Sequence, residues 1–182
     1  MSTTSSLSRP PQLLPSEVPP TTPRQRAAAK RGLLIAGLVS LAMQVVGAAI
    51  SIGAALPAQV AFGDTLLDPA DATPALVAQE FLTKGTALAP PVFLTIAFAV
   101  MLFLATRRRA AGVVGAVLLT VLSVLFTVAT LGEYANPDRF PDFSSTAYLL
   151  LLILNQITIT ATILFGVAAV VAAFRNRTRR AR

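Results

Sequence analysis

The chain has 182 residues, of which 54% are hydrophobic, and a formal net charge of +7. Soluble domains have an apolar share of about 45–50% with glycine counted, so this composition indicates membrane insertion. The chain has no cysteine or histidine, which excludes disulfides, thiolate nucleophiles, iron–sulfur clusters, bis-histidine haem and histidine-ligated zinc for this chain alone. We expect no cofactor.

Residues 1–31 are rich in Ser, Thr and Pro and contain few large apolar side chains. Such a segment buries too little apolar surface to offset the entropy of ordering it, so we expect a disordered cytoplasmic tail. Pro20 and Pro23 have the PxxP spacing of polyproline ligands, but a solvated tether explains the same residues.

The first long apolar run covers residues 33–56, which is enough for roughly 30 Å of hydrocarbon. Lys30 and Arg31 precede this run and Pro57 follows it. A secretory signal peptide is the alternative, because small residues surround Pro57. The apolar core of a signal peptide is only about 7–15 residues long, so the sequence favours a retained membrane span.

Residues 57–86 form the longer predicted external loop. Thr73 followed by Pro74 has the pattern of a helix start, and Gly85 suits a helix end. We therefore expect a short amphipathic helix that lies at the outer membrane interface.

The second and third predicted spans, residues 87–106 and 110–132, are separated only by the triplet Arg107–Arg109. So short a connection predicts a tight antiparallel hairpin. Pro90 and Pro91 should lie in the first turn of the second span or kink it there.

Residues 133–145 form the second predicted external loop, in which Asn136, Pro137 and Asp138 are typical of turns. The fourth predicted span covers residues 146–174, and a basic cytoplasmic tail, residues 176–182, follows it.

Charges are sorted by loop along the chain. Apart from Lys84 and Arg139, the basic residues lie in the two tails and in the Arg triplet, whereas most acidic residues lie in the loops predicted to be external. Cytoplasmic flanks accumulate Lys and Arg. The sequence therefore predicts an all-α protein of the cell membrane, in which residues 32–175 form an antiparallel bundle of four transmembrane helices with both termini cytoplasmic.

The same charges bear on partners. Because the basic residues form neither a stripe nor an aromatic-interleaved patch, we expect no nucleic acid. We expect a lipid bilayer with anionic headgroups on the cytoplasmic side, together with either a second copy of this chain or another membrane protein subunit.

Small and polar residues recur at three- and four-residue spacing in the first, third and fourth spans, which places them on one stripe of each helix. Such stripes are typical of helix seams, where hydroxyl groups bond to their own helix. Gln44, Asn155 and Gln156 are the candidate site residues, because three amides could also line a polar passage or a ligand pocket.

The external acids offer no clear chemistry. Asp64, Asp68 and Asp71 lack the glycine-punctuated pattern of a calcium loop, and Pro69 interrupts their spacing. The acids near residue 133 form an equally loose set, so we expect ordinary solvated carboxylates and no catalytic, cofactor-binding or metal site.

These observations favour a protein that is not an enzyme and acts through helix packing, as an accessory, scaffold or assembly subunit. A small channel or transporter component with a polar pathway between its helices is the alternative. A lipid-modifying enzyme that uses the external acids is the third hypothesis.

Overall fold

The computed structural model describes residues 22–58, 67–107, 110–134, 137–140 and 142–180. These residues form helices, with no β-strand among them. The elements in chain order are α1 (Pro23–Gly53), η1 (Pro69–Asp71), α2 (Pro74–Thr83), α3 (Val92–Thr106), α4 (Ala110–Glu133), η2 (Pro137–Arg139) and α5 (Ser145–Arg180). The prediction of an all-helical protein is confirmed.

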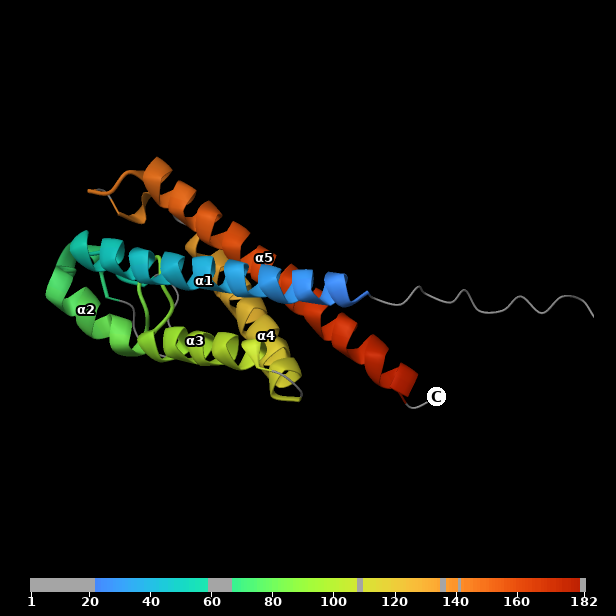
Figure 1. Ribbon diagram of the computed structural model, residues 1–182. Coiled ribbons are helices and arrows are strands. Elements are labelled where there is room, and N and C mark those ends of the chain that lie inside the picture. The colour runs from blue at the N-terminus through green and yellow to red at the C-terminus, as the bar shows by residue number, and fades with distance from the viewer. Residues whose placement is uncertain (1–21, 59–66, 108–109, 135–136, 141, 181–182) are drawn as a thin grey trace, which may run out of the picture.

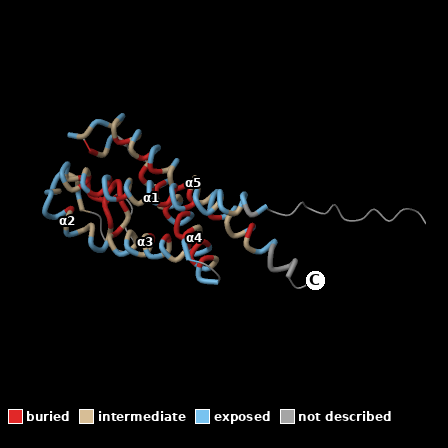
Figure 2. The backbone as a smooth tube through the Cα atoms, viewed as in Figure 1, coloured by how far each residue is buried: buried red, intermediate tan, exposed pale blue. Residues whose placement is uncertain are grey.

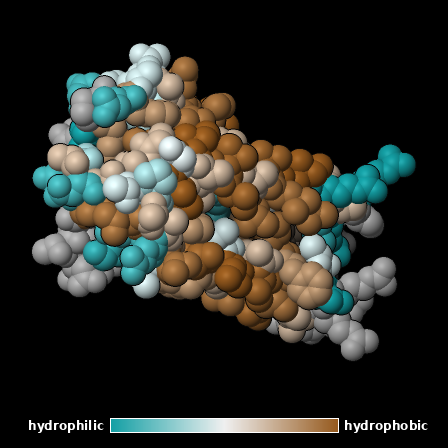
Figure 3. Space-filling model, turned by 90° about the vertical axis from the view of Figure 1, so that its left-hand side faces the viewer, coloured by the Kyte–Doolittle hydropathy of each residue, from teal (hydrophilic) through white to brown (hydrophobic). Residues whose placement is uncertain are grey.

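Three of the described helices are long and apolar enough to cross a membrane: Arg24–Gly53 within α1, Ala110–Glu133, and Ser145–Arg175 within α5. Helix α3 is equally apolar but has only 15 residues. Large hydrophobic side chains are exposed along all four of these helices. Figure 3 shows the apolar residues gathered across the middle of one face, with hydrophilic residues towards its two sides.

Helix α1 begins about ten residues before the predicted span. The hydroxyl of Thr22 accepts a hydrogen bond from the Gln25 amide at 3.2 Å, and the Gln25 side chain accepts one from the Thr22 amide at 2.8 Å. This capping box, with Pro23 as the first helical residue, starts a helix efficiently. The predicted tail therefore overlaps α1, and its first 21 residues lie outside the described part of the chain.

Helix α5 extends in the same way beyond its predicted end at residue 174, since no glycine or proline interrupts residues 175–180. It packs against α1 and α4, while α3 packs mainly against α4. The start of α1, the end of α3, the start of α4 and the end of α5 lie at one end of the molecule (Figure 1). Buried residues gather where these helices face one another (Figure 2).

Helix α2 forms where the sequence predicts it. Pro74 is its first residue, and the Thr73 hydroxyl accepts a hydrogen bond from the Leu76 amide at 3.3 Å. The helix ends at Thr83, and Gly85 follows with a φ of 94°, which favours glycine. Figure 1 places α2 at the opposite end of the molecule from the start of α1.

A buried turn, residues 85–91, replaces the first turns of the predicted second span. Helix α3 begins only at Val92, because proline disfavours the helical conformation in the residue before it and two prolines stand in a row here. Inside the turn, the Thr86 amide donates to the Ala89 carbonyl at 2.8 Å, and the Ala89 amide donates to the Thr86 hydroxyl at 3.1 Å.

The rest of the protein satisfies the remaining amides of the buried turn. The Leu88 amide donates to the hydroxyl of Ser51 in α1 at 3.2 Å, and the Ala87 amide donates to the Leu56 carbonyl at 3.3 Å. These bonds attach the turn to the end of α1. A buried backbone group without a partner is costly, so Ser51 stabilises a segment that is distant in sequence.

Helix α1 approaches the buried turn closely at Gly47. A Cβ atom at this position would lie 2.5 Å from the carbonyl oxygen of Leu88, a distance that only a shift of the backbone could relieve. Gly53, in the last turn of the same helix, has no atom within 4 Å of the corresponding point. Gly47 is therefore crowded and Gly53 is open, so the two glycines of α1 can be compared as a test site and its control.

We predict that Gly47→Ala lowers the free energy of unfolding by about 1–3 kcal/mol, because the new methyl group overpacks the contact with the turn. Gly53→Ala should leave it within about 0.5 kcal/mol of the parent. Thermal unfolding of both variants in one detergent measures the difference. Equal melting temperatures for the two variants would show that α1 does not rest on the turn.

Candidate functional site

Most hydroxyl groups in the helix seams hydrogen-bond to their own helix. In α4, the hydroxyls of Thr120, Ser123, Thr127 and Thr130 each donate to the carbonyl oxygen four residues earlier, at distances between 2.7 and 3.1 Å. Thr162 in α5 does the same at 2.9 Å. Hydroxyls bonded in this way need no further partner, and these side chains serve to fill the seams.

Polar contacts between side chains also join neighbouring helices in the middle of the bundle. The Ser40 hydroxyl of α1 donates to the Thr158 hydroxyl of α5 at 3.1 Å. The Gln156 amide of α5 donates to the hydroxyl of Thr127 in α4 at 3.2 Å, with the hydroxyl of Thr160 at 3.4 Å. The structure therefore places Gln156, one of the three candidate amides, in the seam between α4 and α5.

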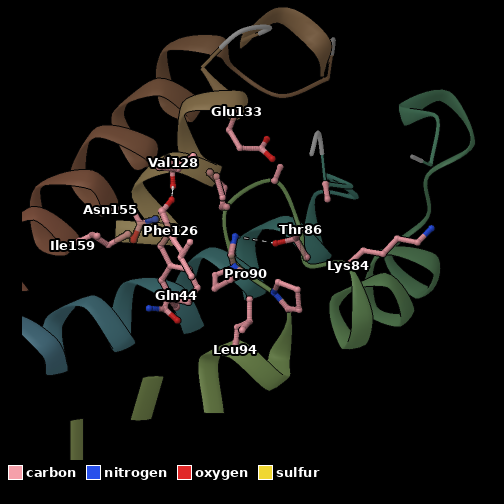
Figure 4. Close-up of a pocket in the computed structure, with 18 of the residues that line it drawn as sticks. Gln44, Lys84, Thr86, Pro90, Leu94, Phe126, Val128, Glu133, Asn155 and Ile159 are labelled. Carbon is pink, nitrogen blue, oxygen red and sulfur yellow. Dashed lines mark hydrogen bonds between the residues drawn. The ribbon is translucent and has the colours of Figure 1, made fainter. Parts of the chain in front are cut away.

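Gln44 and Asn155, the other two candidate amides, line one cavity of about 600 Å³. Gln44 lies on α1 and is only 1% exposed; Asn155 lies on α5 and is 8% exposed. Among the described residues, neither Oε1 nor Nε2 of Gln44 has a hydrogen-bond partner, and Oδ1 of Asn155 has none. Figure 4 shows the two side chains with Phe126 and Ile159 at one side of the cavity.

The remainder of the cavity wall is mainly apolar. Helices α3 and α4 contribute most of it through Phe93, Leu94, Leu122, Leu125, Phe126, Val128 and Ala129. Three of these side chains, Phe93, Leu125 and Val128, are also more than half exposed on the outside of the protein. The cavity therefore opens sideways between α3 and α4.

The buried turn closes the cavity at the end where α2 lies, since residues 86–91 all line it. Glu133, the last residue of α4, stands beside the turn (Figure 4) and is 8% exposed. The Tyr148 hydroxyl of α5 donates to Oε2 of Glu133 at 2.9 Å, with the Ala87 carbonyl as a longer second acceptor at 3.4 Å. Tyr148 thus joins α4, α5 and the turn.

An apolar cluster closes the opposite end of the cavity. Phe98 of α3 and Phe126 of α4 stack with ring centroids 6.0 Å apart. Leu102 and Leu119 continue the same buried cluster along α3 and α4 towards the end where α1 begins. Because these side chains offer no hydrogen bonds, the polar surface around Gln44 does not extend through the described part of the bundle.

One acidic residue, Glu133, differs from the expectation drawn from the sequence. Glu133 was expected to be a solvated acid of the external loop, but it is buried and bonded to Tyr148. Asp138 accepts a hydrogen bond from Ser145 at 2.6 Å, and Asp68 caps η1. Asp64 lies outside the described residues, among which no group of three or more acids could hold a metal ion.

One tyrosine near the cavity has a shifted pKa. Burial raises the pKa of Tyr134, which follows Glu133, above its usual value by desolvating the charged form.

Comparison of the chain with protein-family models, curated proteins and solved structures found no match.

We predict that Ser51→Ala lowers the free energy of unfolding by about 1–3 kcal/mol, because it leaves the buried amide of Leu88 without its acceptor. Ser123→Ala is the matched control, since Ser123 is as fully buried but its hydroxyl bonds only to its own helix. That variant should change stability by no more than about 0.5 kcal/mol. Equal effects in thermal unfolding would contradict the role assigned to Ser51.

Proposed function

We propose that this protein crosses the cytoplasmic membrane four times, with both termini inside. The charges support this orientation. At the end of the molecule where α1 begins, the described basic residues include Arg24, Lys30, Arg31 and Arg107; at the other end the acids include Asp71, Glu80 and Asp142. Basic residues accumulate on cytoplasmic flanks, and anionic headgroups on that side are the expected lipid partner.

The proposal requires α3 to cross the membrane although it is short. Fifteen helical residues span about 22 Å at 1.5 Å per residue, less than the roughly 30 Å of hydrocarbon. The buried turn can supply the missing depth. Non-helical backbone is tolerated at membrane depth where it is buried in protein, and the turn meets that condition through Ser51 and Leu56.

Within this topology we propose a non-enzymatic accessory, scaffold or assembly subunit, which acts through helix packing. The observation that carries this proposal is that most of the seam hydroxyls are bonded within their own helices. The seams therefore hold the helices together and do not present reactive groups. The absence of histidine and cysteine from the sequence points in the same direction.

The partner is a second copy of this chain or another membrane protein subunit. The exposed sides of α3, α4 and α5 carry large apolar residues that are suited to a lipid or to another helix. Nucleic acid remains excluded from the proposal, because the basic residues stay at the helix ends.

A channel or transporter component is the second candidate, supported by the two amides that face the cavity. The cluster around Phe98 and Leu102 argues against a continuous polar pathway. A closed pocket fits these residues better than an open pore does.

We predict that the tagged protein, extracted in a mild detergent, elutes as a complex heavier than its own 19.0 kDa plus the bound detergent. Native mass spectrometry would then identify either a second copy or another membrane protein at fixed stoichiometry. An unrelated four-span membrane protein carrying the same tag is the control for non-specific capture. A lone monomer in several mild detergents and in native lipid discs would contradict the subunit proposal.

A further inference from the structure

We propose that the cavity between α1, α3, α4 and α5 binds a neutral lipid that carries a hydroxyl group and enters sideways between α3 and α4. The site is defined by Gln44 and Asn155, which approach it from two different helices. This inference goes beyond the proposed subunit role and does not depend on which partner the protein assembles with.

The side chains of Gln44 and Asn155 have polar atoms without hydrogen-bond partners among the described residues. Gln44 is almost fully buried, yet its donor and its acceptor are both unpartnered, and the acceptor of Asn155 is unpartnered as well. A buried polar group without a hydrogen bond is strongly disfavoured. A ligand that satisfies both amides must both donate and accept hydrogen bonds, and a hydroxyl group does both.

Gln156 shows why these two amides differ from an ordinary packing residue. It has the same side chain as Gln44 and stands next to Asn155 in the sequence, but it does not line the cavity and its Nε2 donates to the hydroxyl of Thr127; its Oε1, like Oδ1 of Asn155, has no partner among the described residues. The bundle can therefore give an amide a partner. It does not do so for Gln44, whose amide faces the cavity.

The charges around the cavity favour a neutral ligand. Among the described residues that line the cavity, Lys84 is the only basic one, and it forms a salt bridge with Glu80 at 3.2 Å. Glu133 also lines the cavity at the end closed by the buried turn, so an anionic headgroup there would lie against carboxyl oxygens and find no basic partner. A cationic group at the depth of Gln44 would find amides and no carboxylate, which makes desolvation costly.

The size and lining of the cavity suit a single apolar chain. Its volume of about 600 Å³ lies in the range of known small-molecule sites. At about 30 Å³ for each water-sized group, this corresponds to roughly twenty non-hydrogen atoms. Leu122, Phe126 and Ile159 present apolar surface on the helices next to the amides.

The route of entry follows from the exposed residues at the cavity mouth. Phe93 on α3, together with Leu125 and Val128 on α4, lines the cavity and is exposed on the outside. In the proposed topology this mouth faces hydrocarbon, so a lipid can enter from the bilayer without crossing water. Sideways entry also explains an apolar cavity that is closed at both ends, by the buried turn and by the cluster around Phe98.

The test uses a diazirine analogue of hexadecanol and the full-length protein in lipid discs. Photolysis should attach the probe to residues of the α3 and α4 cavity wall, as mapped by mass spectrometry. Unlabelled hexadecanol should compete, whereas hexadecane and palmitate should not. Equal competition by hexadecane would overturn the assignment of a hydroxyl-bearing ligand, and competition by palmitate would overturn its neutrality.

Amide variants test the polar contact. Gln44→Leu should reduce labelling at low probe concentration by about tenfold, which corresponds to roughly 1.4 kcal/mol of binding free energy; Asn155→Leu should do the same. Gln156→Leu is the matched control and should retain parental labelling. A Gln44→Leu variant that is labelled as strongly as the control would overturn the proposal.

Mouth variants test the route without touching the amides. Val128→Trp places a bulky side chain at the rim of the mouth, whereas Val121→Trp makes the same change one heptad earlier on α4, at an exposed position outside the cavity lining. Both residues are on the protein surface, so both variants should fold. We expect at least a fivefold slower labelling for Val128→Trp alone, and equal rates would contradict sideways entry.

Discussion

Hydrocarbon offers no hydrogen bonds, so every polar group inside a membrane protein must find its partner within the protein. In the proposed topology that constraint acts most strongly on the buried turn, residues 85–91, where the amides of Leu88 and Ala87 are bonded by the Ser51 hydroxyl and the Leu56 carbonyl. Tyr148 fixes the same turn to the end of α4 through Glu133. Residues of this turn also line one end of the cavity. One set of hydrogen bonds therefore positions both α3 and the candidate site.

Features of the fold that depend on residues close together in the sequence could be predicted from the sequence. The long apolar runs of α1, α4 and α5 were recognised by length, and α2 by Thr73 and Pro74. The early start of α1 was missed because the Pro-rich composition outweighed the local capping box of Thr22. Pro90 and Pro91 explain the late start of α3, but the attachment of the buried turn to Ser51 on α1 could not be predicted, because no local pattern in the sequence reveals that contact.

The candidate site also combines features that the sequence predicts with features that depend on contacts between helices. The stripe spacing indicated that Gln44 and Asn155 face inward, whereas Gln156 was added as a third amide of the span. The hydroxyl of Thr127 that binds Gln156 lies on another helix, so the sequence could not separate it from the other two. Glu133 was placed in the loop, since nothing near it in the sequence points to Tyr148. Which amides line a cavity and which lie in a seam can be recognised only once the helices are packed, and among the three candidates only Gln44 has neither polar atom bonded within the described residues.

The central claim is that the buried turn and α3 together form the second membrane crossing. The chain has no cysteine, so single-cysteine variants on either side of this segment report its topology directly. With a membrane-impermeant maleimide, Asp71→Cys should react in intact cells, whereas Arg107→Cys should react only after permeabilisation. Reaction of both variants under the same condition would place the two ends of α3 in one compartment and contradict the account.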